Sequence, residues 1–249
     1  MRKFGVNTIA YLSEIEKGVS QLDLLFHIHI HGGQIVEIRR EFVKEEKELE
    51  AIAKKATELG LTLYYSVPEP IFKEQLLNQL MLDTVMKEAK RLNAVCVKFS
   101  LGDIRNVSDI EVEKLCIYEK ECESQILIEN GPHGPEGNVQ LLESFFEKQK
   151  KYDGKIALTF DSGNFVSAGF EPLECARQLC DKTKWIHLKD VRGRGESSTI
   201  TMLEEGEIDF KSLLTMFDKE TPAAIEYPCK DYVQVEKEMK KAQILLRHI

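Results

Sequence analysis

Short apolar runs alternate with longer amphipathic stretches from one end of the chain to the other. Compact apolar runs bounded by Gly or Pro predict buried strands, and apolar residues spaced three or four apart predict helices. The expected strands are residues 4–9, 34–39, 61–67, 94–99, 125–129, 155–160, 184–189 and 223–227. The expected helices are residues 20–31, 44–59, 72–92, 108–122, 138–152, 172–180, 209–217 and 234–248.

This alternation predicts the fold class. Strands separated by helices pair in parallel, because each helix carries the chain back across the sheet. A (β/α)8 barrel needs about 250 residues, and this chain has 249. No Gly-x-Gly-x-x-Gly follows the first expected strand, which disfavours a dinucleotide-binding sheet. We therefore predict an α/β fold, a single TIM-barrel domain over residues 1–249.

Composition narrows the classes of partner. The formal net charge is −8 and no basic face is evident, so nucleic acid is not an expected partner. No run of about 18 apolar residues occurs, so no membrane span is expected. The chain has six cysteines without a Cys-x-x-Cys pair, and its N-terminus does not resemble a signal peptide. These features favour a cytoplasmic location.

The candidate chemistry lies at the ends of the last four expected strands. Each of these ends offers one side chain that can bind a metal: Glu129, Asp161, His187 and Glu226. Because side chains alternate along a strand, each of the four shares a face with the residue two positions earlier. In a TIM barrel the C-terminal ends of the strands form the active-site rim, so neighbouring strands bring these residues together.

Three carboxylates and one imidazole suit one divalent ion, namely Mn, Co, Mg or Zn. The alternative is a polar rim of unrelated loop charges and capping residues. Four such residues at four successive strand ends favour the shared metal site.

Further polar residues near the same rim are candidates for substrate binding. Lys98 lies in the fourth expected strand, on the same face as Ser100. If that face is turned inward, Lys98 can hold an anionic group of the substrate or pair with a barrel acid such as Glu37. Lys189 shares a face with His187 and can orient substrate or pair with Glu226. Two loops rich in glycine carry the remaining candidates, which are His133 and Glu136 after the fifth strand and Arg192 and Arg194 after the seventh. A plain turn or a solvated loop is the alternative for each of these loops.

The order and spacing of these motifs resemble the xylose-isomerase-like TIM-barrel superfamily, in its sugar phosphate isomerase/epimerase branch. The resemblance extends over the whole chain. The matching motifs are Val-Glu-Ile at 36–38, Glu129-Asn130, Asp161-Ser-Gly, His187-Leu-Lys-Asp190, Glu205-Gly-Glu-Ile-Asp209 and Glu226. The branch includes ketose 3-epimerases, hydroxypyruvate isomerases and inosose dehydratases.

The resemblance implies that Glu129, Asp161, His187 and Glu226 bind a divalent metal, and that Glu129 and Glu226 are also the acid/base pair. A metal bound to the carbonyl and hydroxyl oxygens of a sugar stabilises an enediolate, while two carboxylates remove and return protons. The chain departs from the family at Asn164, where members often carry a substrate-contacting His. It also lacks a His at the end of the third strand, so the sugar and the reaction stay open.

These features predict a metal-dependent isomerase or epimerase of a small sugar or sugar acid. A metal-dependent dehydratase acting on a keto-polyol and a non-catalytic metabolite-binding barrel are the alternatives. A DNA-repair endonuclease of the same superfamily is disfavoured, since it needs more His ligands and a less acidic chain. A homo-oligomer is possible, because dimers and tetramers are common in the family.

Overall fold

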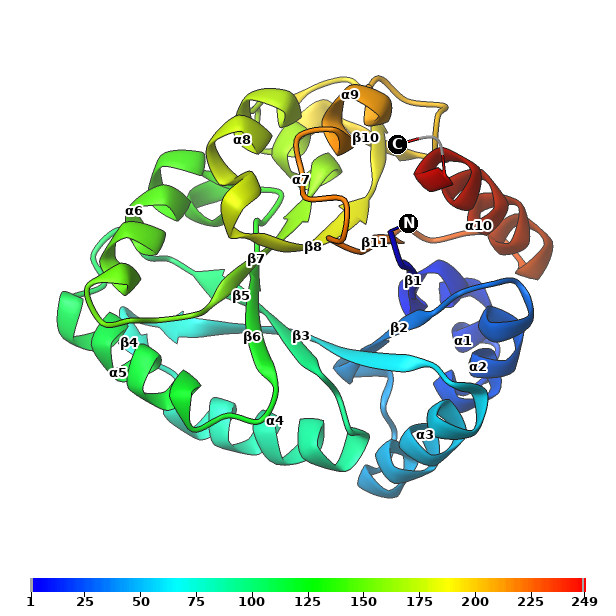
Figure 1. The fold of residues 1–249 in the computed structure, drawn as a ribbon, viewed down its shortest axis with the longest axis horizontal. Coiled ribbons are helices and arrows are strands. Elements are labelled where there is room, and N and C mark those ends of the chain that lie inside the picture. The colour runs from blue at the N-terminus through cyan, green and yellow to red at the C-terminus, as the bar shows by residue number, and fades with distance from the viewer. Residues whose placement is uncertain (1, 248) are drawn as a thin grey trace.

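A computed structural model describes residues 2–247 and 249 of the chain. Eight parallel strands pair edge to edge into a closed barrel, because β2 pairs with β3 and joins the two ends of the sheet (Figure 1). In order around the barrel they are β1 (Phe4–Asn7), β2 (Ile35–Arg39), β3 (Thr62–Lys73), β5 (Cys96–Gly102), β6 (Gln125–Glu129), β7 (Ala157–Asp161), β8 (Thr183–Leu188) and β11 (Ala223–Ile225). The predicted TIM barrel is confirmed.

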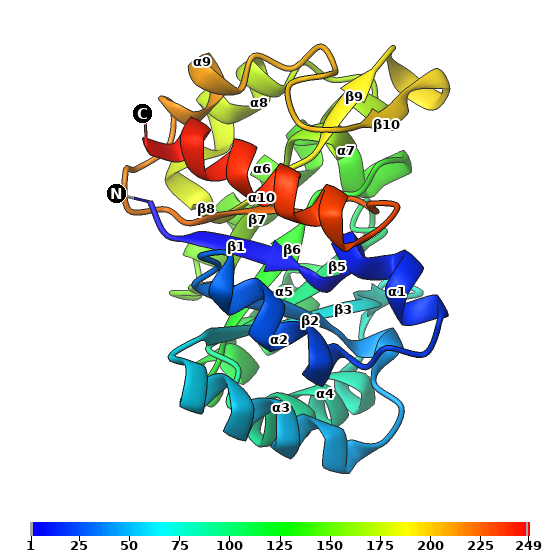
Figure 2. The same cartoon turned by 90° about the vertical axis from the view of Figure 1, so that its right-hand side faces the viewer.

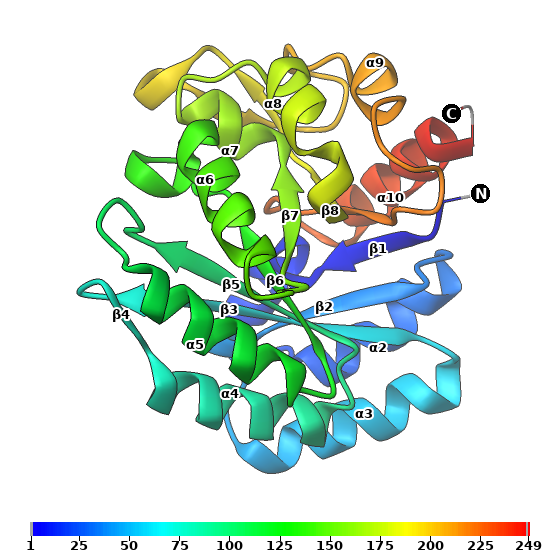
Figure 3. The same cartoon turned by 60° about the vertical axis from the view of Figure 1, so that its left-hand side comes forward.

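Helices surround the barrel on its outside, as the side views show (Figures 2 and 3). They are α1 (Leu12–Glu16), α2 (Gln21–Ile30), α3 (Glu46–Leu59), α4 (Gln79–Leu92), α5 (Asp109–Lys120), α6 (Val139–Lys150), α7 (Ser162–Ser167), α8 (Pro172–Leu179), α9 (Phe210–Leu214) and α10 (Tyr232–Arg247). The last expected helix ended at His248, which lies outside the described residues. None of the helices in the described part of the chain has the length and apolar character needed to cross a membrane.

Local sequence explains where these helices begin and end. In α3, Leu49, Ile52 and Ala56 are buried at helical spacing and face the barrel, while the opposite side is charged. The helix stops at Gly60, which has a φ of 68° and adopts the left-handed conformation that glycine tolerates best. At the start of α5 the hydroxyl of Ser108 accepts a hydrogen bond from the backbone N–H of Glu111, as expected of an N-cap.

The third βα unit differs from the prediction. The strand was expected to end at Val67 and residues 72–92 to form one helix, but β3 continues through Pro68 and Pro70 to Lys73. The pairing of β3 with β5 shifts register between Val67 and Pro70, and such an irregularity accommodates proline within a sheet. Beyond it, β3 turns back through β4 (Leu76–Leu77), so α4 begins only at Gln79.

Two elements on the C-terminal rim were also not expected. The short helix α7 follows Asp161 directly, with the Asp161 carboxylate as its N-cap. The segment after β8 forms a hairpin of β9 (Asp190–Arg192) and β10 (Thr199–Thr201), which stands apart from the barrel sheet (Figure 2).

The barrel interior has an apolar floor below a polar layer. The floor is a separate buried cluster of seven side chains, Ile35, Tyr64, Cys96, Leu127, Ala157, Trp185 and Ala224. Trp185 fits there because Gly5 has no side chain, since a Cβ on Gly5 would lie 2.4 Å from the Trp185 ring. The larger apolar core lies between the strands and the surrounding helices. All six cysteines are free thiols.

Candidate metal centre

The four predicted ligands come from four neighbouring segments of the barrel. Glu129 ends β6, Asp161 ends β7, His187 lies near the end of β8, and Glu226 directly follows β11. These strands are adjacent in the order β6, β7, β8 and β11. Asp161 and His187 are direct neighbours in the pairing of β7 with β8. The predicted adjacency of the four strand ends is therefore confirmed.

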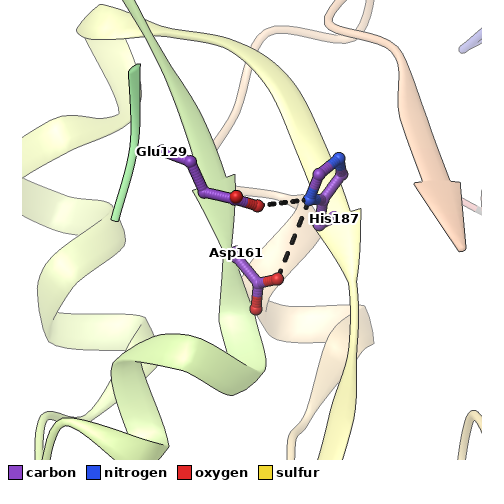
Figure 4. A group of neighbouring side chains, drawn as sticks. All are labelled: Glu129, Asp161 and His187. Atoms are coloured by element: carbon purple, nitrogen blue, oxygen red, sulfur yellow. Dashed lines mark hydrogen bonds and ion pairs between the residues drawn. The ribbon is translucent and has the colours of Figure 1, made fainter. Parts of the chain in front are cut away.

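Three of the four side chains converge on one point. Glu129, Asp161 and His187 each offer a ligand atom within 4.8 Å of the other two. Figure 4 shows both carboxylates directed at one ring nitrogen of His187. The His187 Nδ1 atom lies 2.7 Å from Glu129 Oε1 and 3.7 Å from Asp161 Oδ2. Of the three, Asp161 and His187 are fully buried, so the group lies inside the barrel mouth.

The other ring nitrogen of His187 is held by a residue that sequence reasoning assigned elsewhere. Glu37, on β2 across the barrel, places Oε2 2.7 Å from His187 Nε2 and accepts a second hydrogen bond from the Trp185 indole N–H at 3.0 Å. From the sequence, Glu37 was considered as a partner of Lys98. A carboxylate behind a histidine fixes the ring orientation and leaves its other nitrogen for a metal.

Three cations with little solvent exposure, Lys98, Lys189 and Arg39, surround the carboxylates. Lys98 Nζ lies 2.5 Å from Glu129 Oε2, so the sequence-predicted pairing of Lys98 with a barrel acid involves Glu129 rather than Glu37. Lys189 Nζ lies 2.7 Å from Asp161 Oδ2 and 2.5 Å from Glu226 Oε2. The second oxygen of Glu226, Oε1, accepts a hydrogen bond from Arg39 Nη1 at 3.0 Å.

Glu226 therefore contacts Lys189 and Arg39 and does not belong to the group of three that lies within 4.8 Å. Its assignment as a fourth metal ligand stays a prediction. The ion pair predicted between Lys189 and Glu226 is present.

The close charges shift the pKa values of His187, Glu129 and Glu37 in the direction that favours their ionised forms. Burial opposes the charge on His187, but Glu37 and Glu129 outweigh it and raise the pKa of the imidazole well above its usual value. Burial likewise opposes ionisation of Glu129, yet Lys98 and His187 hold the pKa of its carboxyl well below the usual range. Burial also opposes ionisation of Glu37, but His187 and Lys98 together outweigh it and lower the pKa to about 2.

Two asparagines fix the backbone around Asp161. Asn130 donates from Nδ2 to the Asp161 carbonyl at 2.9 Å and accepts from the Asp161 N–H at 2.8 Å. The backbone N–H of Asn164 donates to Asp161 Oδ1 at 2.8 Å, and its side-chain amide donates to the Asn130 carbonyl. Asn164 thus locks the turn after β7, and its Oδ1 accepts from Lys189 at 3.3 Å.

The remaining predicted substrate contacts lie farther out on the rim. His133 is exposed, while Glu136, on a short 3-10 turn (Gly134–Gly137), accepts a hydrogen bond from Ser100 at 2.7 Å. Arg192 donates to the carbonyl of Glu205 and Arg194 pairs with Glu171. Within the described part of the chain, neither arginine forms a hydrogen bond or ion pair with any of the four predicted ligands.

Neither a protein-family model nor a curated relative matches the chain. Many solved structures do match, over nearly its whole length. The IOLI protein with a bound zinc atom has a TM-score of 0.77 at 16% identity, covering 98% of this chain and 96% of its own. L-ribulose 3-epimerase has a TM-score of 0.74 at 15% identity, covering 100% and 95%. The probable 3-DHS dehydratase AsbF of Bacillus anthracis has a TM-score of 0.73 at 12% identity, covering 97% and 98%.

Other matches are a xylose isomerase domain protein and a xylose isomerase-like TIM barrel protein in complex with magnesium. At this level of identity the likeness establishes the fold alone, which is the (β/α)8 TIM barrel.

Proposed function

We propose that this xylose-isomerase-like barrel is a divalent-metal-dependent isomerase or epimerase of a small sugar or sugar derivative. The observation that carries the proposal is the convergence of Glu129, Asp161 and His187 within 4.8 Å, with the far nitrogen of His187 held by Glu37. A metal-bound histidine with a carboxylate behind it is a recurring arrangement in metalloenzymes. Proteins of the same fold that contain zinc or magnesium add support.

A buried carboxylate oxygen that has no hydrogen bond within the described part of the chain indicates that these residues fit a metal ion. Among the described residues, no regular hydrogen bond reaches Asp161 Oδ2, although this oxygen is fully buried. Its ion-pair partners are Lys189 Nζ at 2.7 Å and His187 Nδ1 at 3.7 Å. The donor set of two carboxylate oxygens and one imidazole nitrogen suits Mn, Co, Mg or Zn. Glu129, Asp161 and His187 would hold the ion, which would supply Lewis acidity toward a substrate carbonyl.

The chain's own carboxylates would move the proton. Glu129 and Glu226 lie on different sides of the barrel mouth, on β6 and after β11. Both oxygens of each carboxylate are in ion pairs. The low pKa of Glu129 keeps it ionised, so it can accept a proton but is a weak base. A weak base requires an acidic C–H, which the position next to a carbonyl provides.

Lys98 and Lys189 would stabilise the negative charge that proton removal creates. Enolisation moves negative charge onto the substrate oxygens, and fixed positive charges in a site that excludes water stabilise such an oxyanion strongly. Lys98 and Lys189 are both largely buried, with side chains 6% and 12% exposed. Their ammonium groups are therefore positioned before any substrate arrives.

A dehydratase is the second candidate. It would begin with the same proton removal and then expel a hydroxyl group from the neighbouring carbon. The specific support is that a probable dehydratase matches the chain about as well as an epimerase does, with TM-scores of 0.73 and 0.74. The substrate, a possible homo-oligomer and the cytoplasmic location stay predictions.

The test is solvent exchange followed by NMR. Manganese-loaded protein is incubated in D2O with a panel of ketoses and keto-acids, and deuterium is sought on the carbon next to the carbonyl. We expect deuterium in one substrate together with its isomer or epimer, and no exchange with the Glu226→Gln variant. Loss of water from the exchanged substrate would instead favour the dehydratase. Turnover without any exchange would contradict proton abstraction.

A further inference from the structure

The ammonium group of Lys189 lies in a cage of three oxygen atoms. Its Nζ atom is 2.7 Å from Asp161 Oδ2, 2.5 Å from Glu226 Oε2 and 3.3 Å from Asn164 Oδ1. The contact with Asn164 Oδ1 is a hydrogen bond, and the contacts with the two carboxylates are ion pairs. A lysine ammonium group is ordinarily charged at neutral pH, so the two carboxylates hold a cation between them.

Packing and backbone hydrogen bonds also hold Lys189 in this position. The aliphatic stem lies against Gly163, where a Cβ would come within 2.7 Å of Lys189 Cγ. The Ser162 hydroxyl donates to the Lys189 carbonyl at 2.9 Å and lies 3.3 Å from its backbone nitrogen, which donates back. Main chain and stem are thus both held by the turn that follows Asp161.

The cage shares its oxygens with the candidate metal centre. Asp161 Oδ1 already accepts the backbone N–H of Asn164, which leaves Oδ2 as the atom that would bind a metal. Lys189 contacts this same oxygen. Both oxygens of Glu226 are also bound by cations, Oε1 by Arg39 and Oε2 by Lys189.

We propose that Lys189 is a tethered cation that competes with a divalent ion for Asp161 and keeps Glu226 out of the ligand set. The ion would then be held by Glu129, Asp161 and His187, and Glu226 would act as a base that does not touch the metal. The inference rests on the metal site of the proposed function. It goes further because it assigns control of the metal affinity to Lys189.

Lys98 provides the natural contrast. Its side chain is 6% exposed against 12% for Lys189, and it also pairs with a candidate ligand. It contacts Oε2 of Glu129, however, whereas Oε1 faces His187 Nδ1. Lys98 therefore leaves the ligand oxygen of its partner free. If only the summed charge of the site mattered, the two lysines would affect a metal equally.

The experiment measures the Mn²⁺ dissociation constant by isothermal titration calorimetry at one pH. Lys189→Met keeps the length of the side chain and removes its charge. We expect this variant to bind Mn²⁺ at least about tenfold more tightly than wild type, and Lys98→Met to change affinity by less than about threefold. Glu226→Gln should leave wild-type affinity within about threefold but weaken the Lys189→Met protein at least about tenfold.

Circular dichroism checks that each variant folds, and Lys189→Gln replaces Lys189→Met if the methionine variant does not. Mn²⁺ binding by the Lys189 variant but not by wild type would support the proposal and refute metal dependence of the natural protein. Equal gains from the Lys98 and Lys189 variants would overturn it, as would no gain or no binding at all.

Discussion

The barrel interior contains two layers built from the same strands, and they differ in almost every respect. The floor consists of apolar side chains, among them Ile35, Leu127 and Trp185. Two residues further along each strand the side chain is polar or charged. These residues are Glu37, Ser66, Lys98, Glu129, Thr159, His187 and Glu226. Because a strand returns to the same face every second residue, one strand supplies both layers.

The contrast shows how the barrel makes a charged site stable. The apolar floor closes the interior to water, so charges above it interact strongly and every one of them needs a partner. Four carboxylates, Glu37, Glu129, Asp161 and Glu226, are accordingly matched by Lys98, Lys189, Arg39 and His187. Trp185 joins the layers, since its ring belongs to the floor and its N–H donates to Glu37.

The largest effect is expected from the polar layer, with Glu226→Gln. This change keeps the shape of the side chain and removes the base, so turnover should fall at least about 1,000-fold while the circular dichroism spectrum stays unchanged. The matched control is Glu171→Gln, at a partly exposed carboxylate that pairs with Arg194, and it should retain wild-type turnover. Normal turnover in the Glu226 variant would remove this residue from the acid/base pair.

The next effect is the pH dependence of the unfolding free energy that arises from Glu37, the carboxylate that contacts both His187 and Trp185. The pKa of Glu37 is lowered to about 2, because His187 and Lys98 outweigh burial. A lowered pKa contributes stability that is present above the unfolded value near 4.5 and is lost as the pH falls toward 2. For metal-free protein, wild type should lose up to about 3 kcal/mol of unfolding free energy over this range through Glu37.

Glu37→Gln should remove this contribution, so the unfolding free energy of the variant should fall less steeply than that of wild type as the pH is lowered from 4.5 toward 2. The measurement is urea unfolding at several pH values with chelator present. Removing this carboxylate also lowers the pKa of His187, which Glu37 raises, so the two curves are compared only below pH 4.5, where a free imidazole is protonated. Identical acid slopes in the two proteins would show that the carboxylate of Glu37 is not ion-paired as described.

A smaller effect is expected from the floor, with Gly5→Ala. The added methyl would lie 2.4 Å from Trp185 Cη2 and 3.2 Å from Ile35 Cβ, and overpacking of this kind costs about 1–3 kcal/mol of unfolding free energy. Thermal unfolding measures it. Trp185→Phe removes the clashing ring atom, so Gly5→Ala should cost clearly less in that background. Equal costs in both backgrounds would contradict the steric explanation.

The smallest effect is expected outside both layers, at Arg192 and Arg194. Both side chains are engaged on the exposed hairpin, with the Glu205 carbonyl and Glu171. Replacing both by alanine should change kcat/KM by less than about twofold, as is usual for solvent-exposed pairs. A loss above about tenfold would mean that the hairpin contacts substrate, as the sequence alone suggested.

Periodicity and strand-end position predicted the barrel and the gathering of Glu129, Asp161 and His187, because both follow from local pattern and strand order. The role of Glu37 was missed, since its contact with His187 spans the barrel and depends on how the ring closes. The extension of β3 past Pro68 and Pro70 was missed as well, because an irregularity in strand pairing leaves no simple signal in the sequence.

The central claim is tested most directly by the metal content of the purified protein, determined by elemental analysis after incubation with Mn²⁺ and removal of excess ion. Wild type is compared with His187→Ala, which removes the imidazole ligand. The account predicts about one divalent ion per chain in wild type and its loss in the variant. No bound metal in wild type, or equal amounts in both proteins, would contradict the account.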